Sequence, residues 1–168
     1  MKIDFGCGKS KKPGYVGVDI TDLQGVDVIH DMNMFPYPFE SDTADELFLD
    51  NVLEHLPNTI GVMEELWRIC KNRGRVEIWV PYYNSPGASA DPTHVKVFTE
   101  NSFDYFTPDG ETWLSHYNYY SKARFSILSV TPSQRKLLDW LPKRLQWFLA
   151  HHFATVHALK VTLEAVKL

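Results

Sequence analysis

Residues 3–20 read IDFGCGKSKKPGYVGVDI and contain two short apolar segments, each followed by residues that suit a nucleoside ligand. Gly6 and Gly8 follow the first segment, and glycine there lets the backbone approach a ligand closely. Asp19 ends the second segment, where a carboxylate can accept hydrogen bonds from two ribose hydroxyls. A tight turn would explain the glycines alone, but the two segments together predict a nucleoside pocket. A dinucleotide is disfavoured, because its fingerprint needs a third glycine where this chain has Lys11.

The size and composition of the chain predict one domain that spans residues 1–168, since 44% apolar residues can bury a substantial core. The net charge of −4 gives no broad positive field, so nucleic acid is not an expected partner. Cys7 and Cys70 are the only cysteines, and the first residues run directly into an apolar segment rather than a signal peptide. These features predict a cytoplasmic protein with reduced thiols.

Short apolar segments alternate with loops and helices, which is typical of an α/β protein with a mainly parallel sheet. Apolar spacing predicts a helix over Asn58–Asn72, with Cys70 on its buried face. A second, aromatic helix is predicted over Leu137–Phe153. The last two predicted strands are expected to pair as an antiparallel hairpin at the sheet edge. Seven strands are predicted in all, over Lys2–Phe5, Tyr15–Ile20, Val26–His30, Glu46–Asp50, Arg75–Val80, Arg124–Val130 and Val156–Val166.

Four motifs in order resemble those of the class I S-adenosylmethionine-dependent methyltransferases, small members of type 11 in particular. Beyond residues 3–8 and 15–20, they are VIHDM at 28–32 and DNVLEHLP at 50–57. The helix EELWRICK at 64–71, followed by GRV at 74–76, also resembles the segment that leads into strand five of that family. The resemblance covers residues 2–83 and implies a Rossmann-like sheet. It also implies that the chain uses S-adenosylmethionine as its cofactor.

By this resemblance the glycines pass under the methionine part of the cofactor, and Asp4 fixes the loop or contacts the amino group. Asp19 takes the ribose, the third motif holds the adenine, and Asn51 lies beside the sulfonium. Carboxylates suit a cationic cofactor, although Asp4 and Asp31 would also serve as simple turn caps. The full set of expected cofactor residues is Asp4, Gly6, Gly8, Asp19, Ile20, Asp31, Met32 and Asn51.

The chain departs from the family between Gly8 and Asp19, which are only eleven residues apart. A parallel crossover normally needs about a dozen residues or more, so the first crossover helix is expected to be shortened or missing. Residues 82–120 are rich in aromatic side chains and are expected to form a lid and acceptor pocket. Tyr82, Tyr83 and His94 are the residues expected to contact the acceptor; the alternative is a hydrophobic cluster under a long loop.

Methyl transfer from a sulfonium is an in-line displacement, so a base is needed only if the acceptor must lose a proton. His55 and His94 are the candidates, although His55 would also suit a structural hydrogen bond and His94 a lid anchor. The pair Glu54-His55 resembles part of the metal site of small-RNA 2′-O-methyltransferases. Those enzymes have a further carboxylate where this chain has Asn51, so no metal is expected.

The predicted function is methyl transfer to a small-molecule or glycan-type acceptor. A cofactor-binding pseudoenzyme that regulates a partner, and a module for another nucleotide, are the alternatives. The helix at 137–153 carries more apolar surface than a short helix usually exposes. It is expected to cover the sheet face left bare by the short crossover, to form a homodimer contact, or to rest on a membrane surface.

Overall fold

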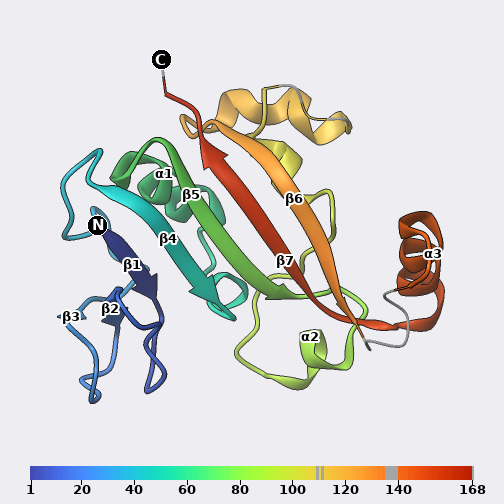
Figure 1. Cartoon of the computed structure of the whole chain (residues 1–168), viewed down its shortest axis with the longest axis horizontal. Coiled ribbons are helices and arrows are strands. Elements are labelled where there is room, and N and C mark those ends of the chain that lie inside the picture. Colours follow the sequence, from blue (N-terminus) through green and yellow to red (C-terminus); the bar gives the residue numbers. More distant parts are fainter. Residues whose placement is uncertain (109, 111, 135–139, 168) are drawn as a thin grey trace.

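The computed structural model describes residues 1–108, 110, 112–134 and 140–167, and its centre is one seven-stranded sheet (Figure 1). The strand order is β3-β2-β1-β4-β5-β7-β6. Strands β1 to β5 pair in parallel, whereas β7 is antiparallel to both β5 and β6. This confirms the predicted Rossmann-like sheet with an antiparallel C-terminal hairpin. The strands are β1 Lys2–Phe5, β2 Val16–Asp19, β3 Val28–Ile29, β4 Ala44–Asp50, β5 Cys70–Pro81, β6 Phe125–Gln134 and β7 Val156–Ala165.

One face of the sheet is covered and the other is open. Along β5 the side chains of Val76, Ile78 and Val80 are fully buried, whereas the intervening Glu77 and Trp79 are half-buried. The buried side chains belong to the same core cluster as apolar residues of α1 (Thr59–Ile69) and of the 3-10 helix η2 (Ser102–Phe106). Figure 1 looks onto the open face, with α1 behind the strands. Side chains along β5 therefore alternate between buried and half-buried because α1 and η2 cover only one face of the sheet.

The open face exists because the connections from β1 to β2 and from β2 to β3 lack a crossover helix. The connection from β3 to β4 lacks one too, but it lies against α1 on the covered face. Residues 6–15, 20–27 and 30–43 join β1 to β2, β2 to β3 and β3 to β4 without any helix. The expected shortening of the first crossover is confirmed and extends to the next two. Long charged side chains shield the exposed rings instead: the Lys12 ammonium lies 3.9 Å from the Phe48 ring centroid.

Helix α1 is shorter than the sequence predicts. Asn58 caps it by accepting a hydrogen bond from Gly61 N at 3.0 Å, but the helix ends at Ile69. Its last carbonyls accept hydrogen bonds from the backbone of residues 42 and 43, and this pairing turns the chain into β5. Cys70 therefore begins β5 beside Ala44, and the prediction that it lies on the helix is wrong.

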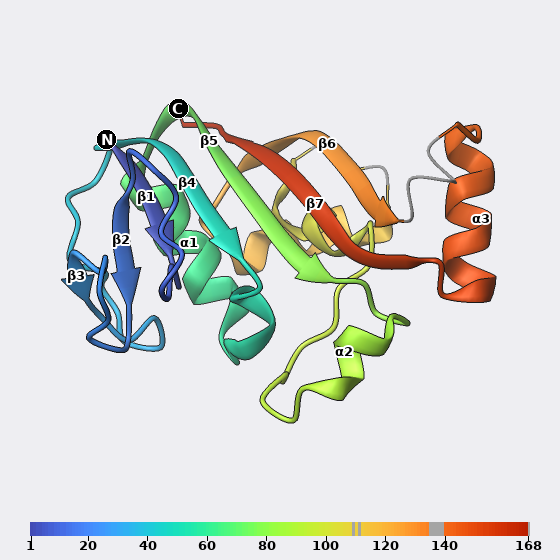
Figure 2. The same cartoon turned by 60° about the horizontal axis from the view of Figure 1, so that its bottom comes forward.

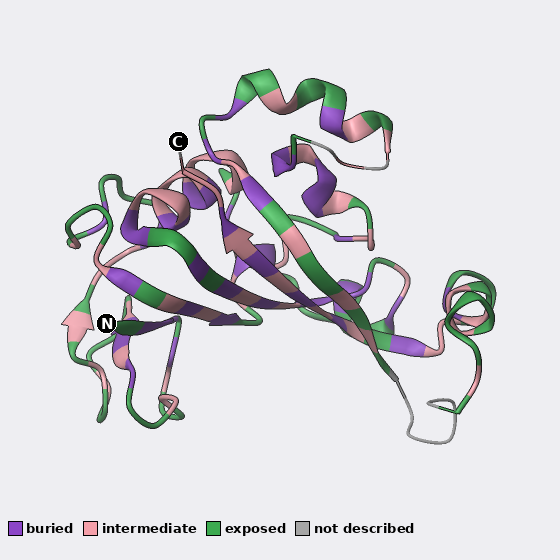
Figure 3. Ribbon diagram, turned by 45° about the horizontal axis from the view of Figure 1, so that its top comes forward, coloured by how far each residue is buried: buried purple, intermediate pink, exposed green. Residues whose placement is uncertain are grey.

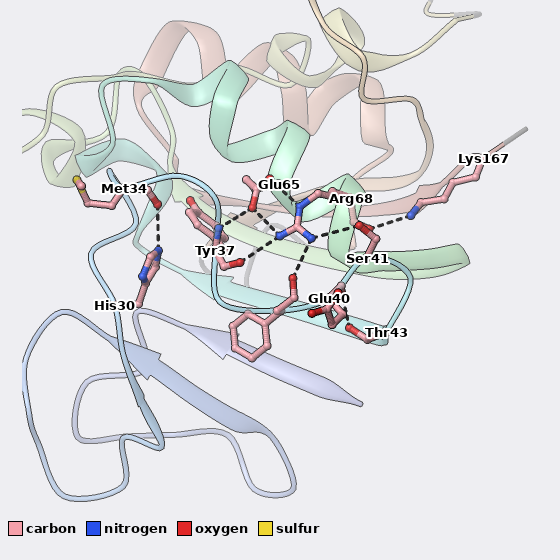
Figure 4. A network of polar contacts seen from close by, with 10 residues as sticks. His30, Met34, Tyr37, Glu40, Ser41, Thr43, Glu65, Arg68 and Lys167 are labelled. Atoms are coloured by element: carbon pink, nitrogen blue, oxygen red, sulfur yellow. Dashed lines mark hydrogen bonds and ion pairs between the residues drawn. The ribbon is translucent and has the colours of Figure 1, made fainter.

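The connection from β3 to β4 is held against α1 by one arginine (Figure 4). The Arg68 guanidinium donates to the carbonyl of Phe39 at 2.8 Å, to that of Tyr37 at 3.1 Å, and to both oxygens of Glu65 at 2.8 Å. Glu65 in turn accepts a hydrogen bond from Tyr37 N at 2.7 Å. Although burial opposes it, hydrogen bonding from Arg68 and Tyr37 lowers the pKa of Glu65. The network gives a helix-free connection, residues 30–43, a fixed path.

Helix α3 (Lys143–Phe153) does not cover the open face. It lies beyond the ends of β6 and β7, which it joins (Figures 1 and 2). Trp147 packs against the core cluster, with its ring centroid 6.1 Å from that of Tyr82, and Ala150 is fully buried. The expectation that this helix covers the bare face is therefore wrong, because its packing against Tyr82 keeps it at the hairpin end. The predicted start at residues 137–139 lies outside the described residues.

The outer side of α3 carries exposed apolar residues, among them Phe148 and Phe153 (Figure 3). Dimer and membrane contacts through this helix stay predictions. In the part of the chain that the structure describes, no helix has the length and apolar content to cross a bilayer.

We expect Arg68→Ala to lower the free energy of unfolding by about 2 kcal/mol, because two backbone carbonyls and a half-buried carboxylate lose a charged donor. Urea unfolding measures the change, and Arg75→Ala, an exposed arginine of β5, is the matched control. Equal losses in the two variants would contradict the role assigned to Arg68.

Candidate functional site

A cavity of about 280 Å³ lies where β1, β2 and β4 end, at the carboxyl edge of the sheet. Ligands bind at this edge in open α/β sheets. Two of the eight residues expected to bind the cofactor, Asp4 and Gly8, do not line the cavity. The other six do: Gly6, Asp19, Ile20, Asp31, Met32 and Asn51.

The loop after β1 needs glycine at position 6. Gly6 has φ +67°, and a Cβ built on it would lie 2.3 Å from Val52 Cγ2. Its amide donates to the carbonyl of Val18 at 2.7 Å, so the loop closes over the end of β2. Any side chain here would disturb both the turn and the cavity wall, which explains the first glycine of the motif.

Two carboxylates shape this loop from either side. Asp4 is buried, and its Oδ2 accepts a hydrogen bond from Lys12 N at 2.7 Å. Burial raises the pKa of Asp4, with the Lys12 amide and ammonium opposing the rise. Asp19 accepts from Gly8 N at 2.9 Å and from Thr21 N at 3.0 Å. Each Asp19 oxygen accepts one hydrogen bond from the described residues, so lone pairs remain for ribose hydroxyls.

The wall beyond β3 comes from the connection that Arg68 holds. Asp31 accepts hydrogen bonds from the backbone and side-chain nitrogens of Asn33 at 2.9 and 3.0 Å, so it does cap a turn while lining the cavity. Met32 is buried, and its carbonyl accepts from the Tyr37 hydroxyl at 2.9 Å. The sequence analysis missed four further lining residues, which flank the motif positions: His30, Asn33, Val52 and Leu56.

Asn51 lies directly after β4 in a left-handed conformation, with φ +53°. The backbone N–H of Asn51 donates to the carbonyl of Trp79 at 3.0 Å, and this hydrogen bond fixes the turn against β5. Asparagine tolerates this conformation better than most residues, so the backbone explains part of its presence here. The side chain donates to Asp50 Oδ1 at 2.8 Å at the cavity rim.

His55 lines the same cavity and has a defined tautomer. Thr93 Oγ1 donates to Asp91 Oδ1 at 2.6 Å and therefore accepts from His55 Nδ1 at 2.9 Å. This arrangement puts a hydrogen on Nδ1, so the neutral imidazole has its lone pair on Nε2. The Asp91–Thr93–His55 chain thus fixes the orientation of the imidazole at the cavity.

His94 packs beside His55, with ring centroids 4.7 Å apart. Its Nε2 lies 3.8 Å from Oε1 of Glu54, a residue whose carboxylate is buried. Burial raises the pKa of Glu54. The structure therefore brings both candidate bases together and adds Glu54, which the sequence analysis considered only in a comparison with a metal site.

The described residues of 82–120 are divided between the core and the surface. Tyr82 is fully buried, and its hydroxyl donates to Glu100 at 3.0 Å, so the expectation that it contacts the acceptor is wrong for this conformation. Burial raises its pKa, and the Glu100 carboxylate reinforces the rise. Phe103 and Phe106 of η2 also belong to the core. Tyr83 is 38% exposed at the end of β5 and stays a candidate.

A larger cavity of about 480 Å³ lies between η2, β6 and α3, and it is lined by Asp104, Phe125 and Trp147 among others. It shares no lining residue with the cavity beside Gly6. The smaller cavity is the stronger site candidate, because the glycine loop, the strand-end carboxylates and an oriented histidine converge there.

Residues 3–78 match the family model described as a methyltransferase domain. No curated protein sequence matches the chain. Solved structures share its fold at low sequence identity. An S-adenosylmethionine-dependent methyltransferase from Mesorhizobium loti has a TM-score of 0.60 at 11% identity, over 97% of this chain and 89% of that one. One from Archaeoglobus fulgidus has a TM-score of 0.61 at 16% identity, over 97% and 85%.

A third similar structure comes from a complex between the Haloferax volcanii Trm112 methyltransferase activator and a methyltransferase. Its TM-score is 0.62 at 11% identity, over 99% of this chain and 82% of that one. The family model covers the motif-bearing segment, which is less than half of the chain, and the solved structures agree with it in fold. The chain is therefore similar to methyltransferases in this segment and shares their fold.

Proposed function

We propose that the protein transfers a methyl group from S-adenosylmethionine to a small-molecule or sugar-like acceptor by in-line displacement. The observation that carries this proposal is the convergence, at one cavity, of six expected cofactor residues with the oriented base His55. Displacement at a sulfonium methyl asks the protein mainly to align the two reactants and to exclude water. One side of the cavity suits the cofactor, and His55 lies where it can meet the acceptor.

The residues present fit the cofactor. The missing Cβ at Gly6 leaves room for the methionine part to pass over the loop. Asp19 has lone pairs for the ribose hydroxyls. Among the described residues both donors to the Asp31 side chain bind Oδ1, which leaves Oδ2 for the adenine amino group. Carboxylates near the cavity also favour the positive charges of the sulfonium and the amino group.

The acceptor side of the proposal rests on His55, His94 and Tyr83. His55 Nε2 can take a proton from a hydroxyl acceptor, since its other nitrogen is committed to Thr93. Tyr83 is held by the bond from its amide to the carbonyl of Phe98 at 3.0 Å, and its ring is exposed. A sugar or phenol hydroxyl fits such a base better than an acceptor that carries no proton.

A regulatory pseudoenzyme would keep the cofactor residues but would not need a base. The Asp91–Thr93–His55 hydrogen bonds orient His55 and require the segment that carries Asp91 and Thr93 to be ordered at the cavity rim. A protein that needs no base gains nothing from this arrangement, so it favours the enzyme over the pseudoenzyme. The proposal is therefore catalysis, with the acceptor class decided by the experiments below.

Asp19→Ala is expected to raise the dissociation constant for S-adenosylmethionine more than about tenfold, because two charge-assisted hydrogen bonds to the ribose are lost. Calorimetric titration measures the constant. Asp22→Ala, an exposed aspartate just after β2, is the control and should bind like the wild type. Unchanged affinity in a folded Asp19→Ala protein would remove this residue from the site.

His94→Gln and Tyr83→Ala are expected to lower methyl transfer at least about tenfold and to leave cofactor affinity near the wild-type value. S-Adenosylhomocysteine release on a panel of sugars and phenols provides the assay. Tyr119→Ala, an exposed tyrosine of the 3-10 helix η3 (Trp113–Tyr120), is the control. A wild-type protein that binds the cofactor but methylates no member of the panel would contradict the proposed acceptor class.

A further inference from the structure

Glu54, His55 and His94 form a cluster at the rim of the cavity. The first two belong to the 3-10 helix η1 (Leu53–His55) after β4, and His94 comes from the segment after α2 (Pro86–Ala90). One ligand atom of each side chain lies within 4.8 Å of the other two. Amides of residues 95 and 96 donate to the Glu54 carbonyl at 2.9 and 3.1 Å, so the backbone fixes the two segments against each other.

The carboxylate of this cluster has no donor. Glu54 is 1% exposed, and neither of its oxygens accepts a hydrogen bond from any residue that the structure describes. A buried carboxylate without a partner is costly, and buried polar groups almost always have one. Glu54 therefore calls for a positive charge or a donor that the described side chains do not provide.

The nitrogen that faces Glu54 is an acceptor when the His94 ring is neutral. His94 Nδ1 lies 3.2 Å from the carbonyl of Ala88, which can only accept, so Nδ1 carries a hydrogen. The neutral ring then has its lone pair on Nε2, which lies 3.8 Å from Glu54 Oε1 and 4.0 Å from Asp91 Oδ2. In the same way, the hydrogen bond to Thr93 leaves the lone pair of a neutral His55 ring on Nε2. With both rings neutral, three electron-rich groups converge.

We propose that Glu54, His55 and His94 bind one divalent transition-metal cation. One carboxylate and two imidazoles are a ligand set that zinc and iron(II) accept. Bonds of about 2.0–2.2 Å place tetrahedral ligands about 3.4 Å apart, so side-chain shifts of about 1 Å close the cluster around an ion. Nδ1 of His94 already donates to the Ala88 carbonyl, and Nδ1 of His55 donates to Thr93 Oγ1. Metal-bound histidines usually donate their other ring N–H to an outer partner in this way.

The structure supplies what the sequence lacked. The sequence disfavoured a metal because Asn51 replaces a carboxylate, but His94 provides the third ligand from a distant segment. Three protein ligands leave at least one position on the ion for water or another oxygen. This step rests on the proposed function: the open position at the cavity rim would hold the hydroxyl acceptor. The ion would polarise that hydroxyl in place of His55 Nε2, which as a ligand cannot also take the proton. The ion would also tie the 91–96 segment to the end of β4.

The alternative occupant is a proton shared between Glu54 and His94. The test is a titration of tag-free, chelator-treated protein with cobalt(II), followed by visible absorption and by metal content after gel filtration. We expect one cobalt per chain, with ligand-field bands that zinc(II) abolishes by displacement. S-Adenosylmethionine is absent from this titration, so its outcome is independent of the proposed methyl transfer.

Two variants and two controls locate the ion. Glu54→Gln and His94→Gln are expected to weaken cobalt binding by more than about tenfold, since losing an outer partner of a ligand alone costs about 10–100-fold. His116→Ala, an exposed histidine of η3, and Asp19→Ala should bind like the wild type. If Glu54→Gln does not fold, His94→Gln decides by itself. No stoichiometric cobalt in the wild type, or undiminished binding by His94→Gln, would overturn the proposal and leave the shared proton.

Discussion

The loop at the carboxyl end of β1, beside the candidate site, depends on one buried carboxylate, Asp4. Its hydrogen bond to Lys12 N pulls a loop of residues 6–15 over the end of β1, where a crossover helix would otherwise stand. Gly6 lets that loop pass Val52, and Asp19 then receives the amide of Gly8. A few directed hydrogen bonds thus replace a helix, and they also shape the cavity wall.

Omitting crossover helices leaves one sheet face in contact with water. A parallel sheet usually buries both faces, and its strands then read as continuous apolar runs. Here Phe48 and Trp79 alternate with buried neighbours, and their exposed face is shared with Glu77 and Lys160, which pair at 3.1 Å. The connection over residues 30–43 also lacks a helix, and it depends on Arg68 instead. The site and the open face are therefore two results of one shortening.

The sequence predicted the sheet well, because a glycine or a carboxylate directly after a short apolar segment marks the end of a strand. It predicted the helix boundary at Cys70 wrongly, since apolar spacing cannot show that the backbone of residues 42 and 43 captures the last turn of α1. It also placed Tyr82 in the acceptor pocket, because composition does not separate an aromatic lid from an aromatic core. The sequence could not predict that His94 lies beside Glu54, because the two residues come from distant segments that only the folded chain brings together.

The central claim is that the cavity beside Gly6 is a cofactor site for S-adenosylmethionine. Calorimetric titration of the wild-type protein with S-adenosylmethionine, S-adenosylhomocysteine, ATP and NAD tests it most directly. The account predicts one site per chain for the first two, which compete with each other, and no measurable binding of ATP or NAD. Binding of ATP or NAD in place of S-adenosylmethionine, or no binding of any of the four by folded protein, would contradict it.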